Sequence, residues 1–91
     1  MPDWSVYIVQ GRTGQLYTGI TTDVARRIEE HNSSVRGSRW CRAHRPVKIV
    51  WQHQAGTRGA AAKLEARIKK LTRPDKLALI AGDDHLVSAV L

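Results

Sequence analysis

Two short tyrosine-bearing runs separated by a glycine turn constrain this chain more than any other feature. The runs and the turn read Trp4-Ser5-Val6-Tyr7-Ile8-Val9, Gly11-Arg12-Thr13-Gly14 and Leu16-Tyr17-Thr18-Gly19-Ile20. Runs of β-branched and aromatic residues on either side of a glycine turn are typical of two strands of a hairpin. Because side chains alternate along a strand, Tyr7 lies on the face opposite its two neighbours. We therefore expect Tyr7 and Tyr17 to lie opposite or diagonal to each other, in a register that the sequence leaves open.

A helix is predicted directly after the second run. Thr22 or Asp23 can cap it, and helical periodicity runs from Val24 to about His31 or Ser33. Its expected apolar face consists of Val24, Ala25 and Ile28. Arg27 and His31 are one turn apart at the edge of that face, so they are directed toward the margin of the sheet. For Arg27 taken alone, a surface role with a packed stem and a hydrated head is an equal alternative.

The middle of the chain is predicted to contain a loop and a third strand. Residues 32–46 include Ser33, Ser34 and Gly37 as breakers, which favours a loop. Residues 47–53 then alternate in hydrophobicity as a strand does. The residues expected on one face of this strand are Val47, Ile49 and Trp51.

The last third of the chain is predicted to be helical. A second amphipathic helix covers about residues 58–71, with a core stripe of Ala60, Leu64, Ile68 and Leu71. Thr72 and Pro74 begin a short third helix, which Gly82 ends. The remaining tail forms either a helix or a strand. The expected order is therefore β-β-α-β-α-α.

Size and composition favour one small domain. Ninety-one residues with 42% apolar content supply a single modest core, and the chain contains no internal repeat or linker. No apolar run approaches the length of a membrane span, and residues 1–4 lack the layout of a signal peptide. The single cysteine, Cys41, fits a reducing compartment and is expected to be an apolar filler or a surface thiol. We expect a cytoplasmic protein.

The positive charge is concentrated in one segment. The entire net charge of +7 comes from the segment between Glu30 and Glu65, which contains no acidic residue. Positive and negative charges balance in the rest of the chain. The basic residues of that segment are Arg36, Arg39, Arg42, Arg45, Lys48, Arg58 and Lys63. Such a patch attracts polyanions and makes their binding salt-sensitive. Nucleic acid is the leading partner, and ribosomal RNA, DNA or an anionic membrane surface could equally supply the phosphates. A merely solvated basic loop is the alternative.

Trp40 stands among arginines that recur every third residue. Interleaved aromatic and arginine side chains suit stacking on bases and pairing with phosphates. The alternative is that Trp40 plugs the core and pins the loop.

Several of these residue types suit phosphodiester hydrolysis, which needs an activated water and compensation of charge on the phosphate. Arg27 can clamp a phosphate oxygen, and His31 can relay a proton or bind the phosphate. A tyrosine near a cation can act as a base once its pKa falls from about 10. Glu65 is either an exposed carboxylate paired with Lys69 or a ligand for Mg²⁺ or Mn²⁺; spacing alone favours the pair.

The ordered set of motifs resembles the GIY-YIG nuclease domain. It comprises Val6-Tyr7-Ile8, Tyr17-Thr18-Gly19 and an arginine eight residues after that glycine. More narrowly, the chain is similar to small stand-alone bacterial members, the YhbQ-like proteins. The motifs carrying this similarity are Tyr17-Thr18-Gly19-Ile20-Thr21-Thr22-Asp23, Arg26-Arg27, His31-Asn32, Arg45-Pro46-Val47, Ile68-Lys69-Lys70-Leu71 and Lys76-Leu77-Ala78-Leu79-Ile80. The resemblance covers residues 4–81, leaving 82–91 as a C-terminal tail of a single domain over 1–91.

The resemblance implies an α+β fold, with a three-stranded antiparallel sheet flanked by helices, and metal-dependent cleavage of nucleic acid. The implied catalytic residues are Tyr7, Tyr17, Arg27 and His31, with Glu65 as the ligand for Mg²⁺ or Mn²⁺. Of the two tyrosines, Tyr7 is favoured as the base. The nucleic-acid-binding candidates are the residues of the basic segment, Arg36, Arg39, Arg42, Arg45 and Lys48.

Three features depart from the family pattern. The first motif lacks its glycine, and the late asparagine of many family nucleases has no counterpart, since Asn32 is the only asparagine. No separate DNA-binding module is present, so binding depends on the basic segment or on a partner protein. The leading hypothesis is a metal-dependent endonuclease acting on DNA in repair or recombination. The alternatives are a nucleic-acid-binding module with little or no cleavage, and an interaction module that uses its hydrophobic tail.

Overall fold

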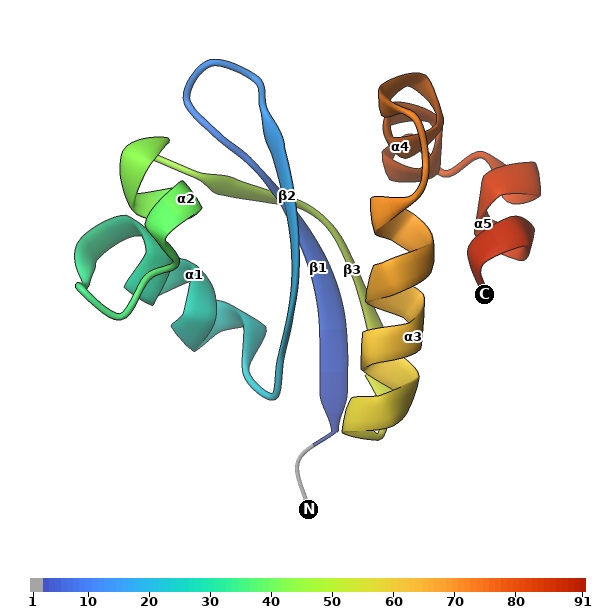
Figure 1. Cartoon of the computed structure of the whole chain (residues 1–91), viewed down its shortest axis with the longest axis horizontal. Coiled ribbons are helices and arrows are strands. Elements are labelled where there is room, and N and C mark those ends of the chain that lie inside the picture. The colour runs from blue at the N-terminus through green and yellow to red at the C-terminus, as the bar shows by residue number, and fades with distance from the viewer. Residues whose placement is uncertain (1–2) are drawn as a thin grey trace.

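A three-stranded antiparallel sheet forms the middle layer of the computed structural model, which describes residues 3–91. The strands are β1 (Trp4–Gln10), β2 (Leu16–Thr21) and β3 (Lys48–Gly56), in the spatial order β2-β1-β3. Helices α1 (Val24–Ser33) and α2 (Arg39–Ala43) cover one face of the sheet. Helices α3 (Arg58–Lys69), α4 (Arg73–Ile80) and α5 (Asp84–Val90) lie on the other side (Figure 1).

The expected α+β fold with a three-stranded antiparallel sheet is confirmed, but the order of elements gains two helices. Residues 32–46 do not form a continuous loop, because α2 lies within them. Ser38 begins this helix as its N-cap, with a side chain that accepts a hydrogen bond from the Cys41 N–H at 3.1 Å. Ser38, which directly follows the expected breaker Gly37, is thus a helix start. The tail, left open between helix and strand, contains α5.

The hairpin register decides how the two tyrosines lie. Tyr7 pairs with Gly19, and Tyr17 pairs with Val9. Tyr7 and Tyr17 are therefore diagonal neighbours on one face, a separation that long aromatic side chains can bridge. The glycine turn is confirmed: Gly14 has a φ of +95°, and the Gly11 N–H donates to the Gln15 carbonyl at 2.8 Å.

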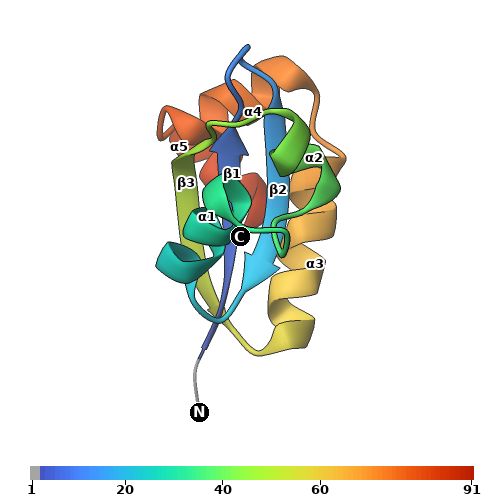
Figure 2. The ribbon, with the colours of Figure 1, turned by 90° about the vertical axis from the view of Figure 1, so that its left-hand side faces the viewer.

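Two hydrophobic clusters form, one on each face of the sheet. Val6 and Ile8 belong to the cluster under α3, whereas Tyr7 and Val9 belong to the cluster under α1 and α2. This confirms the alternation expected along β1. Figure 2 looks onto the second cluster's side, with α1 and α2 in front of the strands.

The alternation predicted for β3 is wrong at one point. Ile49 packs in the cluster with Tyr7, but Trp51 packs in the opposite cluster with Val6. The register shifts here, because Ile8 pairs with Trp51 while Val9 pairs with Ile49. The residue between them is an extra one, as in a β-bulge, and it reverses the side on which the next residues point.

The buried stripes of two helices are also shifted from the prediction. In α1, Ala25 is exposed, and the stripe continues from Val24 and Ile28 to the fully buried His31. In α3, Ala61 is buried and Ala60 is exposed. Alanine is apolar enough to be predicted on the buried face of a helix, but it is small enough to be exposed without a large cost. Both errors therefore concern alanines. None of the helices in residues 3–91 has the length and apolar character that a membrane crossing requires.

Candidate active site

Tyr7 and His31 form a buried hydrogen-bonded pair on the α1 side of the sheet. Tyr7 Oη lies 2.8 Å from His31 Nε2, and the two residues are only 1% and 0% exposed. Tyr7 comes from the central strand and His31 from the last turn of α1, where the helical stripe of Val24 and Ile28 continues. The sequence placed both residues at this margin, and the structure brings them into contact.

The second ring nitrogen of His31 is also occupied. The backbone N–H of Ser38 donates to His31 Nδ1 at 3.1 Å. The ring therefore has no free nitrogen for a phosphate. Burial, and then the charge of Arg27, lower the pKa of His31 to about 4. His31 is consequently neutral near pH 7.

Tyr17 belongs to an aromatic stack at the edge of the same site. Its ring lies 6.0 Å from that of His31, edge-on, and stacks on Trp40 at 5.3 Å. The other side of Trp40 stacks on His44 at 4.1 Å, and His44 Nδ1 lies 2.7 Å from the Trp40 carbonyl oxygen. Trp40 is thus packed against two rings of the chain itself, which favours the core plug over base stacking.

Gly19 gives Tyr7 its position. A Cβ built at residue 19 would overlap Tyr7 Oη and would lie 2.6 Å from Tyr7 Cζ. The hydroxyl of Tyr7 thus occupies the volume that any other residue at position 19 would fill. This close approach explains the glycine at the end of the second tyrosine motif.

Arg27 lies at the rim of the Tyr7–His31 pair. Its Nη1 donates to Glu30 Oε1 at 3.1 Å and to the Arg36 carbonyl at 2.7 Å, and its side chain is 27% exposed. Both bonds leave from Nη1, so Nε and Nη2 keep donors for another acceptor. Burial raises the pKa of Tyr7 far above its ordinary value, and the nearby Arg27 guanidinium only partly offsets this.

Glu65 lies on α3, in the other helical layer. Its carboxylate is 23% exposed and lies 3.5 Å from Lys69 Nζ, so the pair expected from spacing is present. Residues two apart in a helix point about 200° away from each other. Because Arg67 donates to the Val90 carbonyl beside α5, Glu65 faces the opposite flank. The strands on which α3 packs include β2, the edge strand that carries Tyr17.

The oxygen donors present fit one kind of metal site. Within residues 3–91, no cluster of three or more His, Cys, Asp or Glu is arranged to hold an ion. A closed structural zinc site therefore does not fit this part of the chain. Mg²⁺ is commonly held by a single carboxylate together with water and substrate phosphates. Glu65 fits that role, because its partly exposed side chain leaves room for such a shell.

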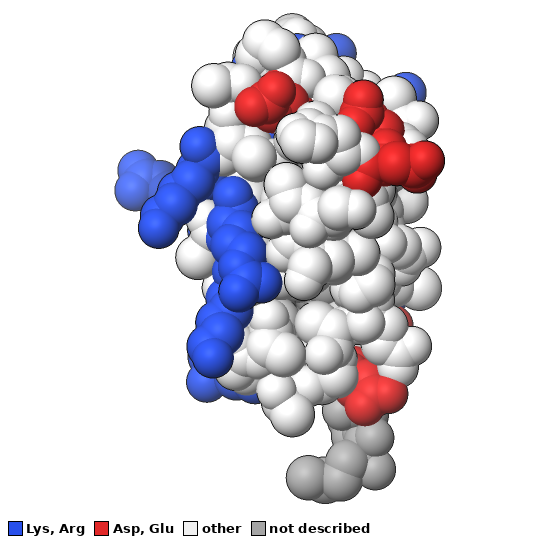
Figure 3. Space-filling view, turned by 90° about the vertical axis from the view of Figure 1, so that its right-hand side faces the viewer, with Lys and Arg blue, Asp and Glu red and all other residues white. Residues whose placement is uncertain are grey.

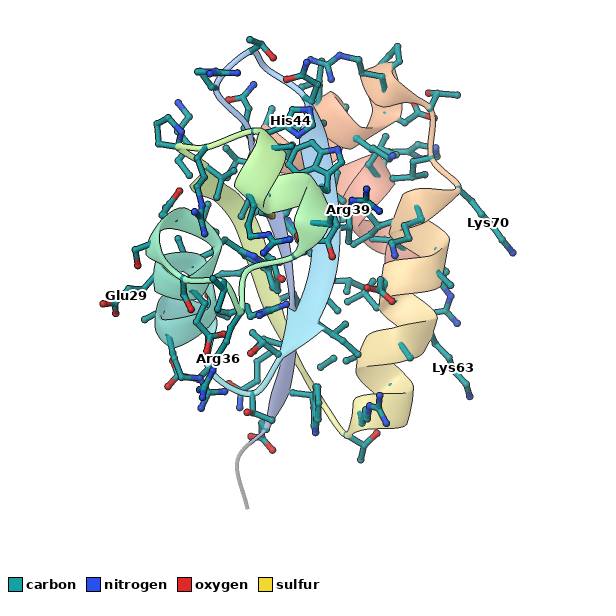
Figure 4. All side chains as sticks on the ribbon, turned by 60° about the vertical axis from the view of Figure 1, so that its left-hand side comes forward. Glu29, Arg36, Arg39, His44, Lys63 and Lys70 are labelled. Carbon is teal, nitrogen blue, oxygen red and sulfur yellow. The ribbon has the colours of Figure 1, made fainter. Side chains whose placement is uncertain are left out.

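The five basic candidates separate into three groups. Arg36, Arg39 and Arg42 are exposed, and the first two lie beside α1 and on α2 in front of β2 (Figure 4). Arg45 is partly buried and donates to carbonyls at the end of α1. Lys48 is exposed beside the hairpin, where it lines an open pocket of about 390 Å³.

Charge also distinguishes the margins of the α3–α5 face. Lysines and arginines line one margin of this face, and most of the carboxylates lie toward the opposite margin (Figure 3). Lys63 and Lys70 project outward from α3 (Figure 4).

Asn32 has a structural role. Its Nδ2 donates to the Val47 carbonyl at 2.9 Å, and its Oδ1 accepts from the Val47 N–H at 2.7 Å. The side chain is therefore committed to joining α1 to the beginning of β3. It does not replace the late asparagine that the family pattern lacks here.

An α+β domain whose hairpin presents two tyrosines to an arginine and a histidine of the next helix defines a nuclease-type fold and site. Residues 3–78 match the GIY-YIG catalytic domain, and the chain belongs to this family. Its relatives include the UPF0213 proteins of Desulfotalea psychrophila, 47% identical over 89 residues, and of Aeromonas salmonicida, 43% identical over 82. The aligned segments cover 98% and 90% of this chain, and 81% and 60% of those proteins.

A solved structure agrees with this assignment. The NMR structure of a UPF0213 protein from Bacillus halodurans has a TM-score of 0.57 to this chain, with 31% identity and 94% coverage of both chains. The expected membership among the small bacterial proteins of the family is confirmed. Family membership supports a nuclease-type function in general.

Sequence reasoning missed two residues that shape the site. Ser38 contacts His31 through its backbone, and Gly37 allows the loop to approach α1 closely: a Cβ there would lie 2.6 Å from the Glu30 carbonyl oxygen. The only signal for Ser38 was its N-cap pattern before Cys41. No sequence pattern predicts which ring nitrogen a backbone N–H will reach.

Proposed function

We propose that this chain is a divalent-metal-dependent endonuclease that hydrolyses phosphodiester bonds in nucleic acid, with DNA as the favoured substrate. The observation that carries the proposal is the buried Tyr7–His31 pair with Arg27 at its rim. A domain that only binds polyanions needs exposed cations, and it has no need of a buried phenol beside a part-exposed arginine.

Arg27 supplies the main phosphate contact in this proposal. Its Nη1 is held in place by Glu30 and the Arg36 carbonyl. The remaining donors clamp a non-bridging phosphate oxygen and stabilise the negative charge that grows there during attack. Because the anchoring bonds fix the guanidinium before the substrate binds, little reorganisation is needed.

The two tyrosines contact the attacking water or the phosphate. Tyr7 is fixed by His31, and its hydroxyl packs against Gly19, whose missing side chain makes room for it. Tyr17 is partly exposed and held against Trp40. We favour Tyr7 as the group that accepts the proton of the water, because it lies beside Arg27, whose positive charge acts against the effect of burial on the Tyr7 pKa.

Glu65 is the residue that would hold Mg²⁺ or Mn²⁺. When bound there, the ion neutralises phosphate charge and stabilises the leaving oxygen. The role of the chain is to present one carboxylate on α3, with room for water and phosphate oxygens.

The nucleic-acid strand is proposed to run along the α1–α2 rim. Arg36, Arg39 and Arg42 are exposed there, and the Arg36 carbonyl binds Arg27 directly. This basic rim therefore adjoins the phosphate clamp. Arg45 contributes through the fold of α1, and Lys48 contacts more distant phosphates. A repair or recombination setting follows from the choice of DNA and is part of the proposal.

The test is cleavage of labelled linear, nicked and branched DNA, and of RNA, with Mg²⁺ or Mn²⁺. Tyr7→Phe, Arg27→Ala and Glu65→Ala are each expected to lower the cleavage rate at least about a hundredfold, the usual loss when a positioned charge-stabilising group is removed. Arg26→Ala and Glu29→Ala are matched controls, since both side chains are exposed on α1. The controls should retain wild-type rates.

Two outcomes would contradict the proposal. Cleavage that survives in all three variants would come from a contaminant, and cleavage without a divalent ion would remove the role of Glu65. Salt-sensitive binding with no cleavage would support the second candidate, a nucleic-acid-binding module. That candidate is favoured by one observation, the commitment of Asn32 to Val47, which leaves no asparagine for the phosphate.

A further inference from the structure

The hydrogen bond between Tyr7 and His31 has two possible directions. Either the phenol donates to a bare Nε2, or a protonated Nε2 donates to the phenolic oxygen. The direction matters because a bare Nε2 can take a proton from Tyr7, whereas a protonated one cannot. The distance of 2.8 Å is the same in both cases.

The second partner of His31 decides the direction. The Ser38 group that lies 3.1 Å from His31 Nδ1 is a backbone N–H, which can only donate. His31 Nδ1 must therefore be the acceptor and carry no hydrogen. In a neutral imidazole with a bare Nδ1, the hydrogen is on Nε2.

The other two protonation states do not fit. A hydrogen on Nδ1 would point at the Ser38 N–H, and this excludes both the opposite tautomer and the imidazolium. The imidazolium is disfavoured further because His31 is fully buried near the guanidinium of Arg27.

We propose that the Ser38 backbone N–H fixes His31 as the Nε2–H tautomer, so that His31 donates to Tyr7 Oη and turns the phenolic hydrogen of Tyr7 toward the substrate. Among the hydrogen-bonding side chains beside Tyr7 Oη in residues 3–91, only His31 Nε2 could accept the phenolic hydrogen, because the Arg27 guanidinium can only donate. With that bond donated by His31, the phenolic hydrogen has no protein acceptor and is available to water or phosphate. His31 and Ser38 are positioning residues, and Tyr7 is the group that meets the substrate.

The loop that carries Ser38 is built to hold this geometry. Gly37 packs so closely on α1 that a Cβ would lie 2.8 Å from His31 Cα. Arg45 donates to the carbonyls of Glu30, His31 and Ser34, which ties the end of α1 to the same loop. The N–H of Ser38 is thereby kept against the ring.

The effect of this arrangement on cleavage rests on the proposed function. The tautomer of His31 is independent of that function. For Tyr7 to act as the base, its own phenolic proton must first pass to solvent, because the protonated Nε2 cannot take it. The resulting phenolate then accepts the proton of the attacking water. A relay from Tyr7 to His31, left open by the sequence, is excluded by this arrangement.

The first test is the tautomer in the full chain. A long-range proton–nitrogen correlation spectrum of nitrogen-15-labelled protein at pH 7 distinguishes bare from protonated ring nitrogens. The chain has four histidines, and the signal that disappears in His31→Gln identifies His31. We expect a bare Nδ1 and a protonated Nε2. A protonated Nδ1 would overturn the proposal.

The second test is kinetic. The amide group of Gln donates a hydrogen bond but does not accept a proton, so His31→Gln should keep the cleavage rate within about tenfold of wild type, the scale of a perturbed hydrogen bond. His31→Ala should lose more. A loss of about 10²–10⁴-fold in the Gln variant would indicate that His31 acts as a base and would overturn the positioning role. A bare Nδ1 in a protein that cleaves nothing would contradict the proposed function and leave the tautomer standing.

Discussion

The Tyr7–His31 pair predicts strong coupling between two substitutions in unfolding experiments. Tyr7→Phe removes the phenolic oxygen and leaves the fully buried His31 Nε2–H without a partner. An unsatisfied buried polar group costs about 1–3 kcal/mol. His31→Leu removes both ring nitrogens, so it leaves the Tyr7 hydroxyl and the Ser38 N–H unpaired. We expect that variant to lose about 2–6 kcal/mol of unfolding free energy, at about 1–3 kcal/mol for each unpaired group.

In the double variant, only the Ser38 N–H lacks a partner, so the loss should be smaller than the sum of the two single losses. The difference should be about 2–6 kcal/mol, which corresponds to one unsatisfied buried group at each end of the bond, at about 1–3 kcal/mol each. The assay is equilibrium urea unfolding of the wild type, both single variants and the double variant at pH 7. The control pair is Val9→Ala with Leu79→Ala, which lie in different hydrophobic clusters and should be additive. Additive losses in the Tyr7–His31 cycle would refute the buried bond.

Three further predictions concern the surroundings of this pair. Gly19→Ala should lower the unfolding free energy by about 1–3 kcal/mol, because the added Cβ would overlap Tyr7. Gly59→Ala is the control in thermal unfolding and should cause no such loss, because a Cβ there has open space in α3. Arg45→Lys keeps the charge but loses the bonds at the end of α1, so it should destabilise by about 1–2 kcal/mol while the salt dependence of nucleic-acid binding stays unchanged. Because the His31 pKa is about 4 in the folded state and about 6.5 unfolded, the unfolded state binds more protons between these values. Stability should therefore fall by up to about 3 kcal/mol from pH 6.5 to 4, and urea midpoints should show a smaller fall in His31→Gln.

The sheet and its two faces follow from local sequence patterns, and most features of the sheet were predictable for that reason. The alternation along β1 separates Tyr7 from Val6, and the glycine turn fixes the hairpin. Only the pairing of Tyr7 with Gly19 was undetermined, because a hairpin register depends on the bonds actually made in the turn. The bulge in β3 was not predictable, since one extra residue leaves no mark in composition.

The site was predictable in its members and not in its contacts. Helical spacing put Arg27 and His31 on the margin of the apolar stripe, and the structure places His31 against Tyr7. The role of Arg45 was missed, because an arginine in a basic segment looks the same whether it meets phosphates or the carbonyls of a helix end. The difference arises only when the chain folds back from α2 to the end of α1.

The Tyr7–His31 pair differs from the rest of the second hydrophobic cluster in what it contributes to stability. Val9, Cys41 and Val47 fill that cluster with apolar atoms, and replacing a buried hydrogen-bonded pair by apolar groups of similar shape is nearly neutral or stabilising. Apolar residues in place of Tyr7 and His31 would therefore stabilise the folded domain about as well as this pair does. Both of its polar side chains are nevertheless hydrogen-bonded: within residues 3–91, every buried side-chain nitrogen and oxygen has at least one partner. A polar group so fully supported, beside a part-exposed arginine that keeps free donors, is better explained by the chemistry at its rim than by folding.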